Sequence, residues 1–296
     1  MLNINEVIND AENGIPEAQN LLASLYLEGD TELGVEQDIQ NAVKWFEKSV
    51  EVGNIAAMGR LGEIYCTGEY GISNTKRGIL LLEKAADAGD NVAMGNLGFV
   101  YSKGVGVLVD REKGFQYFLM SAENGNIAAM HIVAGLYGAG DGVEKDEEQQ
   151  VFWLYQEEIH RKFEASFDKI EELSKEGNAA IEEDDLDYAL ECFENALELI
   201  PDPKEIFSAA TWLYAGMGEV YFLSYDYEQS LEVFQKALQS CGGEENPYIS
   251  YMLGASYYEL GQTDTAKTYL QKAYDMAGEH IFKGDGEKYL KLVIIK

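Results

Sequence analysis

The chain has 296 residues, of which 53 are acidic and 22 basic, so its formal net charge is −31. A field of that sign repels nucleic acid and anionic membrane surfaces and attracts cationic partners, and no apolar run approaches the ~18 residues of a membrane helix. A single hydrophobic core stops growing at roughly 250–300 residues, so this length favours an array in which each unit buries its apolar face against its neighbours.

The first residues and the cysteines predict a reducing location. The opening MLNINEVIND has neither the basic start nor the apolar run of a secretory signal. The cysteines Cys66, Cys192 and Cys241 are odd in number and too widely spaced for a disulfide framework or a metal site. We therefore expect a cytoplasmic protein with free thiols.

Four segments in the first half align with one another, at spacings of 39, 36 and 36 residues. Each has an alanine, an aliphatic residue four positions later, a small residue, a tyrosine and a glycine. The tyrosines are Tyr26, Tyr65, Tyr101 and Tyr137. The apolar positions share one helix face, and the small residue lets a second helix approach closely. We expect Tyr65, Tyr101 and Tyr137 to be largely buried at equivalent sites.

A second helix follows each of these segments. Its start is predicted by an N-cap residue that recurs every 36 residues, at Asp38, Asn74, Asp110 and Asp146. Its end is predicted by glycines suited to a left-handed C-cap, at Gly53, Gly89 and Gly125. The three extra residues of the first repeat fall in the loop between Gly29 and Asp38, and residues 3–14 read as a leading half-repeat.

The pattern of alanine, leucine-glycine, tyrosine, glycine loop and aspartate resembles the Sel1-like repeat family over roughly residues 1–160. This resemblance implies stacked helix–turn–helix pairs. The fourth repeat departs from the pattern, because Arg161 stands where a glycine should end the helix.

The residues after 161 resemble tetratricopeptide (TPR) repeats. The first copy has the motif residues Gly177, Ala180, Ala189, Phe193, Ala196 and Pro201; the second has Gly218, Tyr221, Ser230, Phe234 and Ala237; the third has Gly254, Tyr257, Ala266, Leu270 and Ala273. An extra segment between Pro201 and Thr211 lengthens the first connection. Residues 284–296 are predicted to form a final capping helix, whose Leu290, Val293 and Ile294 cover the last seam.

Together these patterns predict an all-α fold, an α-solenoid forming a right-handed superhelix of about fifteen helices with no sheet. We expect a Sel1-like array over residues 1–161 and a TPR array with its capping helix over residues 162–296. No glycine or proline occurs between Glu144 and Glu176. A helical join and one continuous superhelix are therefore expected.

The sequence contains no recognisable catalytic or metal-binding constellation. None of the three histidines has a histidine or cysteine at ligand spacing, and the single Glu-x-x-His, from Glu157 to His160, lacks the second copy that a di-iron site needs. The glycine clusters at 104–106 and 138–142 follow helices and are repeat turns, not phosphate loops. The acidic run 182–185 lacks the ligand spacing of a calcium loop. We expect no catalysis, no cofactor, no metal and no small-molecule substrate.

The TPR resemblance implies that the first helix of each pair lines a binding groove. Counting along the motif gives the candidate contact residues Asn178 in the first unit, Trp212, Glu219 and Phe222 in the second, and Tyr248, Tyr251, Tyr258 and Glu259 in the third. The corresponding position of the Sel1-like half offers Asn20, Gly59, Gly95 and His131. The aromatic residues either anchor a partner or pack the seams between repeats. The basic clamp with which TPR co-chaperones hold a C-terminal carboxylate is absent from these positions.

The predicted function is a scaffold that binds another protein or peptide in an acidic and aromatic groove, and the net charge predicts a partner of basic character. An alternative is an immunity protein that neutralises a cationic bacterial toxin, because residues 246–290 resemble bacterial TPR proteins found near toxin genes. Residues 141–205 contain 22 acidic and 6 basic residues, a net charge of −16. This segment is expected to form a continuous negative surface, unless its charge serves only solubility.

Overall fold

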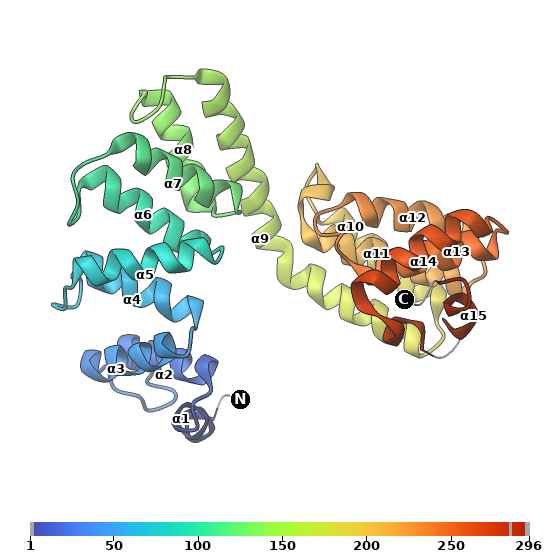
Figure 1. Ribbon diagram of the computed structural model, residues 1–296, viewed down its shortest axis with the longest axis horizontal. Helices are drawn as coiled ribbons and strands as arrows, with labels where there is room; N and C mark the ends of the chain where they lie inside the picture. The colour runs from blue at the N-terminus through green and yellow to red at the C-terminus, as the bar shows by residue number, and fades with distance from the viewer. Residues whose placement is uncertain (1–2, 284–285, 294–296) are drawn as a thin grey trace. The chain divides into compact units, whose positions relative to one another are not determined.

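The computed structural model describes residues 3–283 and 286–293. Over these residues the chain forms fifteen α-helices and no strand beyond an isolated bridge between Asp30 and Val35 (Figure 1). The chain divides into two compact units, residues 1–158 and 159–296. None of the described helices is both long and apolar enough to cross a membrane. The expected all-α solenoid is confirmed.

The first unit is a stack of antiparallel helix pairs preceded by one single helix (Figure 1). Its helices are α1 (Ile4–Glu12), α2 (Pro16–Glu28), α3 (Ile39–Glu51), α4 (Ile55–Thr67), α5 (Thr75–Asp87), α6 (Asn91–Lys103), α7 (Arg111–Glu123), α8 (Ile127–Ala139) and the beginning of α9 (Glu147–Glu182). The even-numbered helices open each pair, and α1 packs on α2 as the expected half-repeat.

Local hydrogen bonds explain where these helices begin and end. Asp38, Asn74, Asp110 and Asp146 each accept a hydrogen bond from the backbone N–H three residues further on. The glycines predicted to end the second helices, Gly53, Gly89 and Gly125, all have a positive φ. Both sets of predictions are confirmed, because capping depends on residues next to one another in the chain.

The close approach of paired helices depends on glycine in both units. A Cβ added to Gly98 in α6 would lie 2.7 Å from the ring of Phe118 in α7. In the second unit a Cβ added to Gly218 would lie 2.6 Å from the ring of Phe234. Only glycine leaves room for these rings, so the small position of the motif is a packing requirement.

The repeated tyrosines are not equally buried. Tyr65 is buried, at 7% exposure, and its hydroxyl donates to Glu47 at 2.6 Å. Tyr101 makes the same contact with Glu83 at 3.3 Å, but Tyr101 and Tyr137 are only partly buried. Tyr65 is therefore buried as expected, whereas Tyr101 and Tyr137 meet the expectation only in part.

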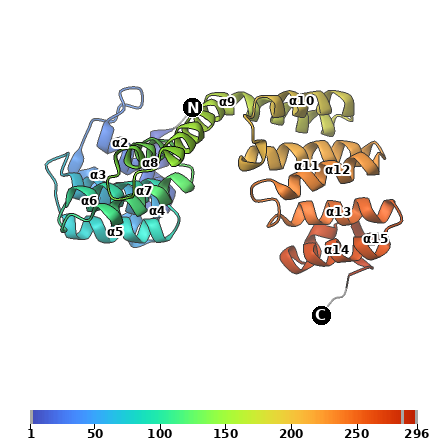
Figure 2. The ribbon, with the colours of Figure 1, turned by 90° about the horizontal axis from the view of Figure 1, so that it is seen from above.

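The second unit stacks three pairs, which Figure 2 shows as successive layers. The pairs consist of the end of α9 with α10 (Leu186–Glu198), α11 (Ser208–Leu223) with α12 (Tyr227–Gln239), and α13 (Pro247–Glu259) with α14 (Thr263–Ala277). Arg161 lies inside α9, which continues to Glu182 without the glycine that would end it. The 3-10 helix η1 (Lys204–Ile206) lies in the expected extra segment. A single superhelix through both arrays stays a prediction.

The C-terminal segment closes the last pair. It consists of a 3-10 helix, η2 (Glu279–Phe282), and a short helix, α15 (Glu287–Leu290). Phe282 and Tyr289 are buried, at 1% and 3% exposure, and Leu290 and Val293 pack against the same cluster. The capping helix is confirmed, although it is short; Ile294 lies outside the described residues.

Candidate functional site

A groove of about 460 Å³ runs along the first helices of the three pairs in the second unit. Its lining residues are Phe167, Glu171, Ser174, Lys175 and Asn178 from α9, Trp212, Ala215, Gly216 and Glu219 from α11, and Tyr248 from α13. Successive lining residues on α9 and α11 are mostly three or four positions apart, so each helix presents one face to the groove.

The floor of the groove is made of small residues for a structural reason. A Cβ added to Gly216 would lie 2.7 Å from the ring of Phe193, which is itself 1% exposed. Ala215 is buried next to it. Packing of α11 on α10 therefore keeps the floor low, and the larger side chains on either side become the walls.

The walls are aromatic and partly accessible. Trp212 is half-buried, and Phe167 is 37% exposed. Tyr248 lies edge-on to Phe234, with ring centroids 6.3 Å apart. Burial and the neighbouring carboxylate of Glu219 raise the pKa of the Tyr248 phenol, so this hydroxyl stays protonated at neutral pH.

The three ionised side chains of the groove differ in their pairing. Lys175 Nζ lies 3.0 Å from Glu171 Oε2, and both side chains are well exposed. Glu219 has the phenol of Tyr248 as a neighbour, and no Lys, Arg or His of the described residues lies within 4.0 Å of its carboxylate. Two glutamates and one lysine leave a formal charge of −1, which resides on Glu219.

Four of the predicted contact residues meet in this groove: Asn178, Trp212, Glu219 and Tyr248. They occupy positions that the TPR motif count assigned to the groove-lining face of the first helices. The motif count therefore placed part of the candidate surface on the helix faces that line this groove. Whether these residues contact a partner stays a prediction.

Three other predicted residues lie beneath the C-terminal segment. Tyr251 meets the rings of Phe282 and Tyr289, with centroids 5.4 and 5.9 Å away, and Tyr258 also contacts Tyr289, at 5.4 Å. The structure thus does not place Tyr251 and Tyr258 in one concavity with Trp212. The reason is that the cap occupies the place that a further repeat would take.

Glu259 belongs to the same covered region. Its Oε1 accepts hydrogen bonds from Lys288 Nζ at 2.5 Å and from the Tyr289 hydroxyl at 2.7 Å. Burial acts to raise the pKa of Glu259, but these hydrogen bonds and the charge of Lys288 outweigh it and hold the pKa below its ordinary value. Glu259 therefore helps to hold the cap.

The two remaining predicted residues lie elsewhere. Phe222 packs against the clusters around α13 and the cap, and its ring lies 5.2 Å from that of Tyr227. His131 belongs to the first unit, where its exposed ring is 2.9 Å from a carboxylate oxygen of Glu157. Neither lines the groove.

Phe167, Lys175 and Gly216 are among the groove residues that the motif count did not name. Phe167 precedes the first position of the TPR motif and was missed because α9 is longer than a standard first helix. Glu171 follows Phe167 by four positions and Asn178 follows Glu171 by seven, so all three lie on one face of a helix. This spacing could have identified Phe167 from the sequence. Lys175 lies four residues after Glu171, the spacing of a helical ion pair.

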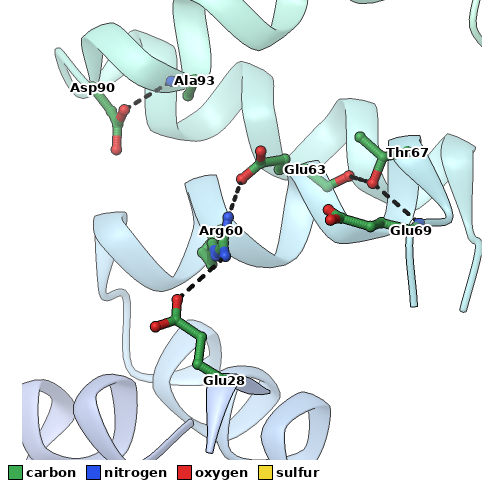
Figure 3. Close-up of polar contacts among 7 residues, drawn as sticks. All are labelled: Glu28, Arg60, Glu63, Thr67, Glu69, Asp90 and Ala93. Atoms are coloured by element: carbon green, nitrogen blue, oxygen red, sulfur yellow. Dashed lines mark hydrogen bonds and ion pairs between the residues drawn. The ribbon is translucent and has the colours of Figure 1, made fainter. Parts of the chain in front are cut away.

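The equivalent helix faces of the first unit make many contacts within the array. Arg60 in α4 donates to Glu63 at 2.7 Å and lies 3.7 Å from Glu28 in α2 (Figure 3). A Cβ added to Gly59 would lie 3.1 Å from Asp90, and one added to Gly95 would lie 3.2 Å from Ser121. Gly59 and Gly95 are thus approached by side chains from further along the array, at the start of α6 and in α7.

A smaller apolar cavity lies between α6 and α8. Its volume is about 320 Å³, and Phe99, Phe118 and Ile132 are among its lining residues. Phe99 and Ile132 are 47% and 38% exposed. No ionised side chain lines this cavity, so it lacks the charged groups of the groove on α9, α11 and α13.

Comparisons with known proteins agree with the two kinds of repeat. The Sel1 repeat model matches residues 16–54, 55–90, 91–126 and 127–156, and the tetratricopeptide repeat model matches residues 207–279. No curated protein matches the chain. Repeats of these two families are generally scaffolds for protein–protein interaction and are typically not enzymes.

Several solved structures are similar to the chain. The protective antigen c5321 of uropathogenic Escherichia coli, with an SLR fold, is 22% identical over 98% of this chain and 59% of its own, with a TM-score of 0.49. The chain therefore spans about three fifths of that antigen's length. A Sel1 repeat protein from Oxalobacter formigenes is 21% identical over 88% of this chain and 85% of its own, with a TM-score of 0.40.

The TPR2AB domain of yeast Sti1, in its complex with pHSP90, is 14% identical over 95% of this chain and 97% of its own, with a TM-score of 0.35. The repeat assignment does not depend on these structures, since the family models match this sequence directly. The chain carries Sel1 repeats in its N-terminal part and tetratricopeptide repeats in its C-terminal part.

Proposed function

We propose that the protein is a non-enzymatic scaffold that binds a segment of a basic protein in the groove formed by α9, α11 and α13. The observation that carries the proposal is the half-buried Trp212 on a small-residue floor, between Phe167 and Tyr248. Tryptophan and tyrosine are the commonest anchors of protein interfaces, and they act where a pocket removes them from water. A partly covered ring gains most from a partner that completes its burial.

The size and chemistry of the groove support a peptide ligand. Sites for small ligands measure about 300–1,000 Å³, and 460 Å³ holds a few side chains. Asn178 is exposed at the edge and offers both a donor and an acceptor to a peptide backbone. The lining residues include no histidine or cysteine, so they suit contact better than nucleophilic catalysis.

The basic character of the partner is supported by charge. The net charge of the chain is −31, and the acidic residues Glu182, Glu183, Asp184 and Asp185, at the end of α9 and in the turn after it, are all exposed. Such a field speeds the capture of a cation and weakens as salt is added. The association rate should fall between low salt and about 0.5 M, where the Debye length is well below 10 Å. A rate unchanged by salt would count against a basic partner.

The proposal can be tested without a known partner. Peptides displayed on phage are selected on the folded protein, with the Trp212→Ala variant as the competing decoy. We expect enriched peptides that contain lysine or arginine and bind the unaltered protein at least about tenfold more tightly than the decoy. Peptides that bind both proteins equally would overturn the groove as the binding site.

The net charge also favours a narrower candidate, in which the partner is a cationic bacterial toxin. Capture of a basic toxin by an acidic protein benefits from the same electrostatic steering. If a toxin gene lies beside this gene, co-expression of this protein should restore growth, and Trp212→Ala should abolish the protection. Full protection by that variant would remove the immunity candidate.

A further inference from the structure

We infer that Glu219 and Trp212 form a binding site for one lysine or arginine side chain of the partner. This inference rests on the proposed function, because it names the chemistry that the groove selects. It goes further by assigning the charge recognition to a single carboxylate among the two that line the groove.

The first argument is the different pairing of the two carboxylates. Glu171 already has the ammonium group of Lys175 at 3.0 Å. Glu219 has the phenol of Tyr248 as its neighbour and no cation of the described residues within 4.0 Å. An incoming cation therefore gains more from Glu219 than from Glu171.

The second argument is the geometry of α11. Trp212 and Glu219 are seven residues apart, which is two helical turns and about 10 Å along one face. Between them lie Ala215 and Gly216, which leave an apolar strip without obstruction. A lysine or arginine has an aliphatic stem that covers such a strip and a charged head at its end. The tryptophan face attracts a cation, and most strongly a guanidinium group.

Tyr248 acts as a positioning residue for this site. It is partly buried, and burial together with the neighbouring Glu219 carboxylate raises the pKa of its phenol. The protonated hydroxyl is therefore an available donor beside this carboxylate. A donor on one side of the carboxylate holds it in place and leaves its other lone pairs for the ligand. The Glu219 carboxylate is thus oriented before the partner arrives.

The third argument is a lysine that the chain itself supplies to a similar arrangement. On α13, Glu259 binds Lys288 Nζ at 2.5 Å, and the same ammonium group lies 4.7 Å from the ring centroid of Tyr289. There the Glu259 carboxylate and the Tyr289 ring both contact the lysine, and the Tyr289 hydroxyl donates to the same carboxylate. In the groove, Glu219, Trp212 and Tyr248 supply a carboxylate, an aromatic ring and a tyrosine hydroxyl from other positions of the repeat, and no cation of the described residues lies within 4.0 Å of Glu219.

The test uses single amino acids as probes, so that it needs no partner. The full-length protein is labelled with ¹⁵N-tryptophan and titrated with N-acetyl-argininamide, N-acetyl-lysinamide and the neutral isostere N-acetyl-citrullinamide. Trp45 and Trp153 are buried, at 8% and 7% exposure, so Trp212 is the responsive indole, and Trp212→Phe assigns its signal. We expect a saturable shift with arginine and lysine, and a response at least about tenfold weaker with citrulline.

The matched variants are Glu219→Gln and Glu171→Gln, which remove one charge each from the same groove. The first should weaken the arginine probe at least about tenfold, and the second should change it by less than about twofold. Unchanged thermal unfolding shows that both variants are folded. An equal response to citrulline, or binding indifferent to Glu219→Gln, would overturn the inference.

The two proposals fail in different ways. If the displayed peptides require Trp212 but tolerate Glu219→Gln, the cation site is wrong and the groove remains the binding site. If the arginine probe depends on Glu219 but no peptide depends on Trp212, the groove function is wrong. Glu219→Lys adds a further check, because it should shift the selected peptides from basic to acidic sequences.

Discussion

The two units build the same helix pair with different turns. In the first unit residues 68–74 join α4 to α5, and the loop begins with Gly68 at a φ of +67°. In the second unit residues 224–226 alone join α11 to α12, and Tyr225 adopts a positive φ. Yet both units press a side chain of the second helix against a glycine of the first. The turn can therefore vary while the packing contact is retained.

The units differ more in the use of their aromatic residues. Tyr65 in the first unit is buried and bonded to Glu47 of its own array. Trp212 and Tyr248 in the second unit line an open groove. Aromatic residues at helical spacing thus serve two purposes in one chain. Whether such a residue packs between repeats or lines a contact surface depends only on its position relative to the neighbouring helices.

The largest effect should come from the packing contact that both units share. Phe234→Ala removes a fully buried ring from Gly218 and should destabilise the second unit by about 3–5 kcal/mol. Phe118→Ala removes the corresponding ring from Gly98 and should cost the first unit a similar amount. Denaturant unfolding measures both. A loss below about 1 kcal/mol in either variant would show that the two packing contacts are not equivalent.

The next effect should separate the groove from the seams. Trp212→Ala should weaken peptide binding by about 2 kcal/mol or more, roughly thirtyfold, because it removes the central anchor. Its cost in stability should be smaller, since the ring is only half-buried. Calorimetric titration and thermal unfolding of the same variant provide the comparison. If the melting temperature of this variant falls by several degrees while the folded variant still binds the peptide normally, Trp212 packs between repeats as Tyr65 does.

A smaller effect should distinguish two repeats of the first unit. Tyr65→Phe removes the hydroxyl that donates to Glu47 at 2.6 Å and should cost about 1 kcal/mol, the usual net worth of such a bond. Glu47 keeps its ion pair with Arg77, so it is not left without a partner. Tyr101→Phe, with the longer bond to Glu83, should cost less. If chemical denaturation shows equal losses of stability for the two variants, the difference in hydrogen-bond length between the two repeats does not affect stability.

The smallest effect should be a pH dependence of the cap. The pKa of Glu259 is lowered in the folded protein, so the unfolded chain binds the proton first as the pH falls. The stabilisation from Glu259 is complete above the ordinary glutamate pKa, about 4.3, and disappears as the pH falls through the lower folded value. The difference in melting temperature between the unaltered protein and Glu259→Gln should therefore shrink in that window. If the difference in melting temperature stays constant in acid, the contacts of Glu259 with Lys288 and Tyr289 are not its cause.

The sequence by itself determined the helices and their pairing. N-cap residues such as Asp38, terminal glycines such as Gly89 and the small position at Gly98 could be assigned from spacing alone. Each of these features depends on residues close in the chain or on a contact repeated every 36 residues. The groove positions of α11 followed in the same way, because the repeat motif assigns a face to each helix.

Tertiary structure decided which aromatic residues remain open to a partner. Tyr251 and Tyr258 occupy groove positions by the same count as Trp212, but Tyr289 of the C-terminal segment covers them. Phe167 enters the groove because α9 runs on past Arg161 into the next pair. Both outcomes arise where the periodic pattern is interrupted, at a cap and at an overlong helix. There the neighbour of a side chain is no longer set by the repeat, and only the packed chain determines what covers it.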